Sequence, residues 1–314
     1  MLQYLIILLD DAATSYCHYA NQRTPRLMPL ETLQAAIRFG MTENLMIQFV
    51  YPDAALPQAH RDAIETIDHS KIMASTAADV AEADVVVVHG AETATAATEA
   101  VQGKPCVVRL TKAELAAHPE AVEALMDAAA HVSVVLTDAE TMTDADLEAY
   151  RAALARLAEA VEARYAEGRT PQLNLLTDRM MLEKMNNCNA GWENVTLAPD
   201  GCFYVCPAFY AEGAEAVGSL ADGLDVKNPQ LYRLDHAPLC RRCDAYQCKR
   251  CVWLNRRTTL EVNTPSHEQC VTAHTERNAA RDLLAAIRRH GAFLPDREIK
   301  EIAYLDPFDV RQEW

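Results

Sequence analysis

Eight of the ten cysteines of this 314-residue chain lie between residues 188 and 270. Four of them form a dense run, Cys240-x2-Cys243-x4-Cys248-x2-Cys251, and the other four are Cys188, Cys202, Cys206 and Cys270. Cysteines at this density form disulfides, bind zinc or ligate iron-sulfur clusters. Spacing and composition distinguish between these three chemistries.

Disulfides are the least expected of the three. The chain opens with Met1-Leu-Gln-Tyr-Leu-Ile-Ile-Leu-Leu-Asp10, which lacks the basic start and the cleavage site of a signal peptide and is too short to span a bilayer. We therefore expect a soluble, unexported protein of the cytoplasm, where thiols stay reduced. A chain of this length can also bury a hydrophobic core large enough to be stable without disulfide bonds.

Zinc is the main alternative, and the spacing weighs against it. Zinc sites with four cysteines usually join two Cys-x2-Cys pairs that are about 12 to 20 residues apart, whereas only residues 244–247 separate the pairs here. One ion held by the dense run would also leave the other four cysteines without a role. In two-cluster ferredoxins the last cysteine of a dense run ligates the other cluster. The pattern therefore favours two iron-sulfur clusters.

The charges around the dense run fit an anionic centre. The chain has a formal net charge of −16 at pH 7. Six basic residues nevertheless lie in and just after the run: Arg241, Arg242, Lys249, Arg250, Arg256 and Arg257. Nearby cations lower the pKa of thiols and stabilise an anionic cluster. A solvated basic face is the alternative, and nucleic-acid binding is disfavoured because the acidic remainder of the chain would repel a polyanion.

Several strings around the cysteines resemble a known module. They are Asn187-Cys-Asn-Ala-Gly191, Val195-Thr-Leu-Ala-Pro-Asp-Gly201, Cys206-Pro207, Val217-Gly-Ser-Leu220 and the dense run. This order resembles the SPASM domain, which lies C-terminal in many radical SAM enzymes that modify peptides. The resemblance implies two four-iron clusters, the first held by Cys188, Cys206 and Cys251, and the second by Cys240, Cys243, Cys248 and Cys270. Either Cys202 or an open iron site completes the first cluster.

A hairpin is expected to carry two of these cysteines. Residues 194–198 alternate apolar and polar before the turn sequence Pro199-Asp200-Gly201, and residues 203–205 are a short return strand. Cys202 and Cys206 would then lie at the two ends of the return strand and share one of its faces. This shared face favours Cys202 as the fourth ligand. A helix over residues 271–290 would close the module.

The N-terminal half predicts a different domain. Short apolar runs predict six strands at residues 4–9, 45–50, 71–74, 84–88, 106–110 and 132–136. Amphipathic, alanine-rich segments predict helices between them at residues 29–39, 59–67, 77–83, 91–101 and 121–129. This alternation predicts an α/β fold with a parallel sheet. Six such units match the partial (β/α)6 TIM-like barrel of radical SAM enzymes, and a doubly wound sheet is the alternative.

The expected organisation is therefore a radical SAM-like (β/α)6 domain over residues 1–170, a small α+β SPASM-like domain over 171–290 and a tail over 291–314. A long helix over residues 144–167 bridges to the second domain. Thr76 and Thr143 are expected to cap the starts of helices. Cys106 lies inside a predicted strand and is expected in the core.

The first domain retains one of the three cysteines that radical SAM enzymes carry in the loop after the first strand. In one register Ala13 and Ala20 stand where two of the cysteines would be; in the other register Asp10 and Thr14 do. Phe49-Val-Tyr-Pro-Asp53 replaces the glycine-rich motif after the second strand. We therefore expect no S-adenosylmethionine site and no catalytic residue. The remaining Cys17 is expected to be a buried small hydrophobe or a helper thiol.

A degenerate barrel with an intact SPASM-like tail resembles the CXXX repeat peptide maturase family. The resemblance runs from residues 2–11 and Ser15-Tyr-Cys-His-Tyr19 to Thr264-Pro-Ser-His-Glu-Gln-Cys270 and His274-x2-Arg277. It implies a role in maturing a ribosomally made peptide (RiPP) with cysteine at every fourth position, either as the peptide maturase or as an accessory protein, beside a radical SAM partner enzyme. The alternative is a zinc-stabilised peptide-binding scaffold, in which the nitrogens of His236, His267 and His274 would matter.

Overall fold

The computed structural model describes residues 2–246, 248 and 250–299. Its contacts define two compact units that alternate along the chain. Unit 1 comprises residues 1–88 and 188–237, and unit 2 comprises residues 89–187 and 238–314. The expected boundaries after residues 170 and 290 concern sequence modules and stay predictions. Lys249 and most of the expected tail lie outside the described residues.

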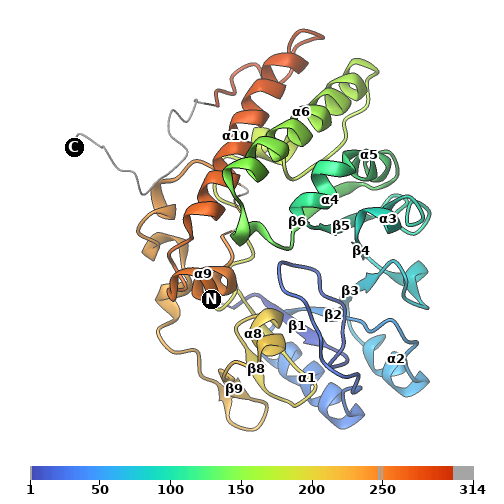
Figure 1. Cartoon of the computed structure of the whole chain (residues 1–314). Coiled ribbons are helices and arrows are strands. Elements are labelled where there is room, and N and C mark those ends of the chain that lie inside the picture. Colours follow the sequence, from blue (N-terminus) through green and yellow to red (C-terminus); the bar gives the residue numbers. More distant parts are fainter. Residues whose placement is uncertain (1, 247, 249, 300–314) are drawn as a thin grey trace. The chain divides into compact units, whose positions relative to one another are not determined.

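Unit 1 is built on a mainly parallel sheet (Figure 1). Strands β1 (Tyr4–Leu8), β2 (Met46–Val50), β3 (His69–Ala74) and β4 (Val85–His89) are parallel neighbours in this order. Helices α1 (Leu30–Thr42) and α2 (Gln58–Ile64) connect the first three strands. The side chains of Leu5, Ile7 and Phe49 are fully buried, as expected for a parallel sheet.

The predicted hairpin extends this sheet on its other side. Strand β7 (Asn194–Leu197) pairs in parallel with β1, and β8 (Phe203–Tyr204) returns antiparallel to β7. The turn between β7 and β8 contains Gly201 at a φ of 79°. Helix α8 (Pro207–Glu212) and the short hairpin of β9 (Gly218–Ser219) and β10 (Gly223–Leu224) complete the unit.

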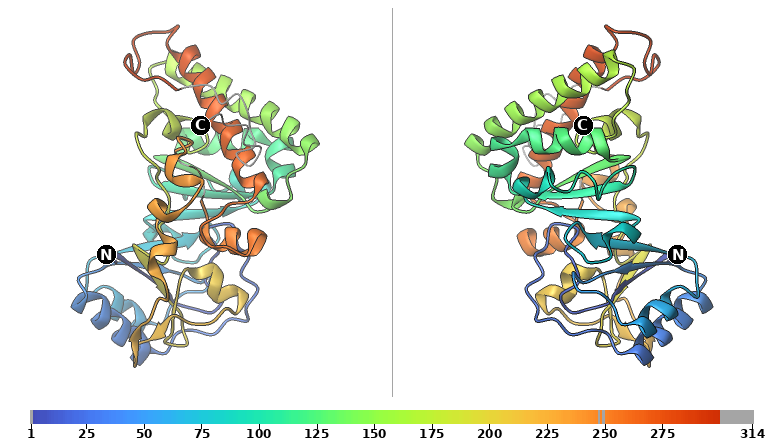
Figure 2. Two further views of the ribbon diagram at one scale, coloured as in Figure 1. Left: turned by 90° about the vertical axis from the view of Figure 1, so that its left-hand side faces the viewer. Right: turned by 90° about the vertical axis from the view of Figure 1, so that its right-hand side faces the viewer.

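Unit 2 contains the parallel strands β5 (Pro105–Leu110) and β6 (His131–Leu136). Its helices are α3 (Ala91–Ala94), α4 (Lys112–Ala117), α5 (Pro119–Ala128), α6 (Asp144–Ala166), α7 (Thr177–Met181), α9 (Val252–Thr259) and α10 (His267–Ile287). The two long helices, α6 and α10, lie side by side in Figures 1 and 2. Each begins with a capping box, formed by Thr143 with Asp146 and by Ser266 with Gln269.

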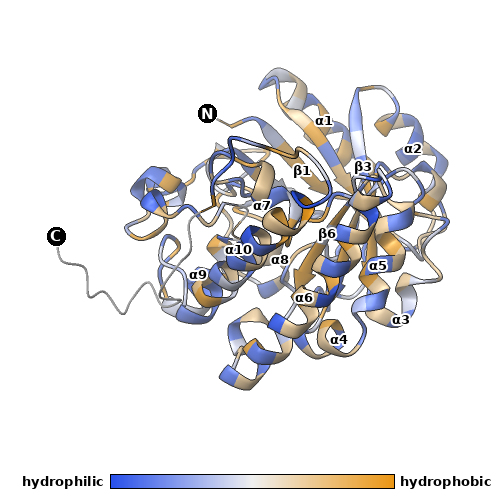
Figure 3. Ribbon diagram, turned by 90° about the horizontal axis from the view of Figure 1, so that it is seen from above, coloured by the Kyte–Doolittle hydropathy of each residue, from blue (hydrophilic) through white to orange (hydrophobic). Residues whose placement is uncertain are grey.

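All six predicted strands are confirmed within one or two residues at each end, and so is the cap at Thr143. Cys106 is 1% exposed in β5, as expected of a core residue. In Figure 3, β1 and β6 are largely hydrophobic, whereas α6 and α10 carry hydrophobic and hydrophilic residues along their length. Among the described helices, none combines the length and the apolar composition that crossing a membrane requires.

Two predicted helices are wrong. Residues 77–83 form only the single 3-10 turn Val80–Glu82, so Thr76 caps no α-helix. This turn buries none of its residues, whereas α2, which also has seven residues, buries His60 and Ile64; a helix this short needs such packing to be stable. Over residues 91–101 only Ala91–Ala94 is helical. There the Thr93 hydroxyl donates to the His89 carbonyl at 2.6 Å, and the Thr98 hydroxyl donates to the Thr95 carbonyl at 3.0 Å. Such side-chain bonds compete with helical ones.

The β9–β10 hairpin gives a matched test of backbone geometry. Gly218 has a φ of 125°, and a Cβ added there would lie 2.1 Å from the Gly223 carbonyl oxygen. We expect Gly218→Ala to lower the free energy of unfolding by about 2–4 kcal/mol, because it adds a clash to a conformation that only glycine adopts readily. Urea denaturation monitored by circular dichroism would measure this loss.

Gly223→Ala is the control in the same hairpin. Its φ is 84°, and in the described part of the chain no heavy atom lies within 4 Å of the added Cβ. It should cost only the left-handed backbone penalty of about 1–2 kcal/mol. Equal losses for the two variants would show that the close approach at Gly218 has no energetic effect.

Candidate metal centres

Unit 2 brings together three cysteines of the dense run. Cys240 and Cys248 are 6% and 9% exposed, and Cys243 is partly buried. Cys248 packs against Ala245 and Ala273, with Cys243 at the edge of the same cluster. Burial raises the pKa of the Cys240 thiol to about 11 and that of the Cys248 thiol to about 12. Without a bound metal these buried groups are therefore neutral thiols, and a metal would have to displace their protons.

Helix α10 places two further predicted residues beside this group. The Nε2 atom of His274 lies 3.8 Å from the Cys243 sulfur. Cys270 is 8% exposed and precedes His274 by four residues, so both side chains lie on one face of α10. The grouping of Cys270 with Cys240, Cys243 and Cys248 stays a prediction, and so does their ligation of one cluster.

Buried arginines interact electrostatically with these thiols. The Arg179 side chain is 2% exposed on α7, and its guanidinium donates to the Tyr246 carbonyl at 2.8 Å. It interacts electrostatically with the thiols of Cys248 and Cys243. Arg250, at 2% exposure, lowers the pKa of Cys240 and of Cys248 against the effect of burial. Arg277 donates to Asp244 at 2.5 Å. Buried thiols among buried cations fit an anionic group.

The predicted basic residues divide into two classes. Arg250 is buried at the thiols, as an anionic centre requires. Four of the others are exposed, so for them the alternative of a solvated basic face holds: Arg241, Arg242, Arg256 and Arg257. The sequence did not single out Arg179 or Glu276, because their roles arise from contacts with segments far away in the chain.

Glu276 holds Arg179 in place. It forms a buried ion pair with Arg179, with side chains 2% and 7% exposed, and accepts a hydrogen bond from the Tyr150 hydroxyl at 2.6 Å. Burial lowers the pKa of Arg179, and the neighbouring thiols oppose this shift. A buried guanidinium needs such an anionic partner to remain charged.

Unit 1 contains three of the four other cysteines of the predicted sites. Cys206 is the N-cap residue of α8, and burial, reinforced by the Cys188 thiol, raises its pKa far above the ordinary value. The backbone N–H groups of Phe209 and Ala208 act in the opposite direction. Cys188 is exposed, and its carbonyl accepts a hydrogen bond from the Asn194 side chain. The thiols of Cys188 and Cys206 therefore interact electrostatically, and their ligation of one cluster stays a prediction.

Cys202 has different neighbours. Its N–H donates to the Asp200 carboxylate at 3.0 Å, and its sulfur lies 4.0 Å from the Asp200 carbonyl oxygen. Burial raises the pKa of the Cys202 thiol, and the carboxylates of Asp200 and Asp222 raise it further. Cys251 is the N-cap residue of α9 in unit 2. The predicted pairing of Cys202 or Cys251 with Cys188 and Cys206 stays a prediction.

The other two histidines that the sequence offered as ligands lie near the protein surface. His236 and His267 are exposed, in the 3-10 turn Leu234–His236 and at the first position of α10. Within residues 2–246, 248 and 250–299, no three His, Cys, Asp or Glu side chains stand close enough to hold a single metal ion. In a four-iron cluster each thiolate binds a different iron, so its ligands are more widely spaced than those of one ion.

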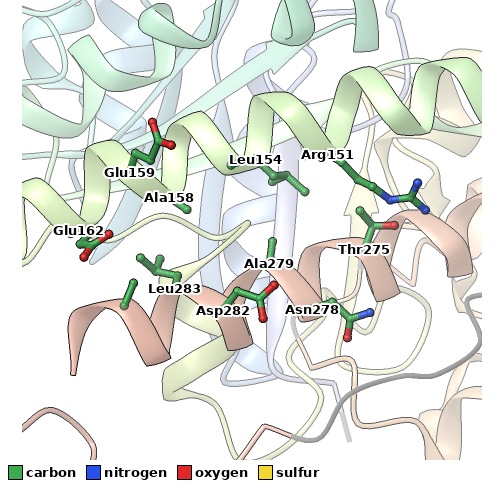
Figure 4. A pocket seen from close by; sticks show the side chains of 12 residues that line it. Arg151, Leu154, Ala158, Glu159, Glu162, Thr275, Asn278, Ala279, Asp282 and Leu283 are labelled. Carbon is green, nitrogen blue, oxygen red and sulfur yellow. The ribbon is translucent and has the colours of Figure 1, made fainter. Parts of the chain in front are cut away.

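A groove runs between α6 and α10 in unit 2 (Figure 4). Leu154, Ala158, Ala279 and Leu283 contribute apolar surface, and its volume is about 380 Å³. Glu159, Glu162 and Asp282 place carboxylates along it, with Arg151 at one end.

Solved structures with the same fold are known, although no protein-family model and no curated protein sequence matches this chain. The chain resembles native anSMEcpe with bound AdoMet and Cp18Cys peptide at 14% identity, over 92% of this chain and 100% of that chain, with a TM-score of 0.58. A histidine-tagged form of anSMEcpe with bound AdoMet gives a TM-score of 0.60 at 14% identity and the same coverage. The likeness confirms the predicted α/β fold of the radical SAM-like partial barrel.

Proposed function

We propose that this chain is an iron-sulfur protein of ribosomal peptide maturation that binds a cysteine-repeat precursor peptide beside a radical SAM partner enzyme, in a reducing cytoplasm. The observation that carries the proposal is the group formed by the buried thiols of Cys240 and Cys248 and the partly buried thiol of Cys243, near the buried cations Arg179 and Arg250. A four-iron cluster would offset the free-energy cost of burying the thiolates and the guanidinium groups.

The fold supports a peptide substrate. A structure of the same fold, anSMEcpe, was solved with AdoMet and the Cp18Cys peptide bound. The cysteine thiols of the proposed precursor peptide could bind cluster iron, as the cysteine thiols of this chain would. Bound clusters would supply electron transfer or coordination of a substrate thiolate. The chain's own residues would hold the clusters, balance their charge and keep water away from them.

Seven cysteines would ligate the two clusters, with Cys202 or an open iron as the eighth position. Cys188, Cys206 and Cys251 form the proposed first set, and Cys240, Cys243, Cys248 and Cys270 the second. Two four-iron clusters predict about eight iron and about eight sulfide per chain. Iron and acid-labile sulfide should be measured on protein prepared without oxygen, together with absorbance near 400 nm. Stoichiometric zinc without sulfide would contradict the proposal.

The loop after β1 is proposed to have lost the S-adenosylmethionine site. The loop instead has internal hydrogen bonds and an ion pair. The Asp10 carboxylate accepts a hydrogen bond from the Ala12 N–H at 2.7 Å, and Arg26 forms an ion pair with Asp11 at 2.7 Å. We expect the purified protein to release no 5′-deoxyadenosine from S-adenosylmethionine under reducing, anaerobic conditions. Chromatography of the products would test this, with an active radical SAM enzyme as positive control. Release by this protein alone would contradict the loss.

Zinc remains the second candidate because of His274. Its Nε2 atom lies 3.8 Å from the Cys243 sulfur, and two ligands of one tetrahedral zinc lie about 3.5 Å apart given Zn–S and Zn–N bonds of about 2.3 and 2.0 Å. Cys243 and His274 would then be two ligands of a structural zinc site in a peptide-binding scaffold without a redox role. His274→Ala would release zinc in that case, whereas iron bound only by cysteines would remain.

A further inference from the structure

We infer that Cys17, and not Cys202, supplies the remaining thiolate beside Cys188 and Cys206. The inference rests on the proposed first cluster and deepens it. It replaces the expectation that Cys17 is a small hydrophobe or a helper thiol. All of the residues that carry it belong to unit 1.

The loop that contains Cys17 is closed on itself. Asn21 accounts for this: its N–H donates to the Ser15 hydroxyl at 2.8 Å, and its side-chain amide donates to the carbonyls of Asp11 and Ala13 at 2.7 and 3.0 Å. Cys17 therefore lies within a compact loop whose two ends are tied together. Cys17 is partly exposed, unlike the core residue Cys106.

The same loop is anchored to helix α8, which begins after Cys206. The Arg23 guanidinium donates to the Tyr210 carbonyl at 2.6 and 3.2 Å and lies 3.9 Å from the centre of the Tyr210 ring. The Tyr210 hydroxyl donates to the Asp11 carboxylate. Because Cys206 precedes Tyr210 by four residues, one turn of α8 separates this anchor from the Cys206 thiol.

This anchoring brings the thiols together. The Cys206 thiol interacts electrostatically with those of Cys188 and Cys17. The phenol of Tyr16 has the same three thiols as neighbours, and the Tyr16 and Tyr19 rings meet edge to face at 6.4 Å. The three cysteines and Tyr16 thus interact with one another, and Tyr19 packs against Tyr16.

Cys202 is the poorer candidate because of its charges. Asp200 and Asp222 are the charged neighbours of its thiol, and Asp200 also accepts from the Tyr204 hydroxyl at 2.8 Å. A cluster with four thiolates is itself anionic. Two carboxylates at one ligand position would oppose its binding, whereas the N–H groups at the start of α8 favour negative charge at Cys206.

The test compares single variants of the full chain, loaded with iron and sulfide without oxygen. Cys17→Ala is expected to lose about half of the iron and sulfide, as Cys206→Ala does, while Cys202→Ala and the core control Cys106→Ala retain both. Cys17→Ser offers an oxygen ligand and should keep part of the iron with a changed electron paramagnetic resonance spectrum. A purely structural Cys17 would give no such change. Circular dichroism would show that each variant is folded.

A second measurement needs no metal. In the reduced apoprotein a short bifunctional thiol reagent, dibromobimane, should bridge Cys17 to Cys206 or Cys188, and peptide mapping would identify the pair. Wild-type protein that binds both clusters while Cys17→Ala keeps its full iron would overturn this inference and leave the proposed function intact. Wild-type protein without iron and sulfide would overturn both. A bridge between Cys202 and Cys206, with no bridge from Cys17, would also overturn the inference that Cys17 is a ligand.

Discussion

Alanine substitution of Cys240 or Cys248 is expected to remove about half of the bound iron, and so is substitution of Cys188 or Cys206. The reason is that these thiols would belong to two different clusters. Cys240, Cys243 and Cys248 belong to unit 2 and interact electrostatically with Arg179 or Arg250, whereas Cys188 and Cys206 belong to unit 1. Loss of one thiolate should release one cluster and spare the other.

A double variant makes the partition testable. Cys206→Ala with Cys240→Ala should lose nearly all iron, whereas Cys243→Ala with Cys240→Ala should lose no more than either single variant. Iron and sulfide analysis of anaerobically loaded protein measures both, with Cys106→Ala as the control. Additive losses within the unit 2 group, or complete loss from any single variant, would contradict two independent clusters.

The strands were predictable because their signal is local. Runs such as Val85–His89 are short, β-branched and apolar on both faces, which is typical of strands in a parallel sheet. The predicted helices at residues 91–101 and 77–83 were wrong because alanine-rich composition reveals neither the competing threonine hydrogen bonds of the first nor the lack of buried side chains in the second. The parallel pairing of β7 with β1 was also missed, since it joins segments about 190 residues apart.

The candidate site was likewise predictable only in part. Cysteine spacing is a sequence pattern, so the unit 2 thiols could be named in advance. The charge that balances them could not be assigned, because Arg179 reaches Cys243 and Cys248 only through the fold. The inferred role of Cys17 is a similar case: Cys17 lies far from the other cysteines of the proposed sites in sequence, and the sequence does not show that its loop is hydrogen-bonded to Tyr210, four residues after Cys206.

Arg179→Met is expected to lower the free energy of unfolding by about 3–5 kcal/mol, because it leaves Glu276 buried without its cation. The pair is enclosed, with side chains 2% and 7% exposed. Arg169→Met is the matched control: Arg169 pairs with Asp127 and Glu167 at the surface, where such pairs contribute about 0–1 kcal/mol. Tyr150→Phe, which removes one hydrogen bond to Glu276, should cost about 1 kcal/mol. Chemical denaturation of the four proteins measures these differences.

The double variant Arg179→Met with Glu276→Leu separates stability from the role of Arg179 at the thiols. Removing both charges should restore most of the lost stability, because no buried charge is then unpaired. In Arg179→Met the reduction potential of the second cluster should fall, because a cation near the thiols favours the more negative reduced state and the remaining carboxylate opposes it. In the double variant the potential should fall less, since the carboxylate is gone as well. Equal potentials in wild type and both variants would show that Arg179 only stabilises the fold.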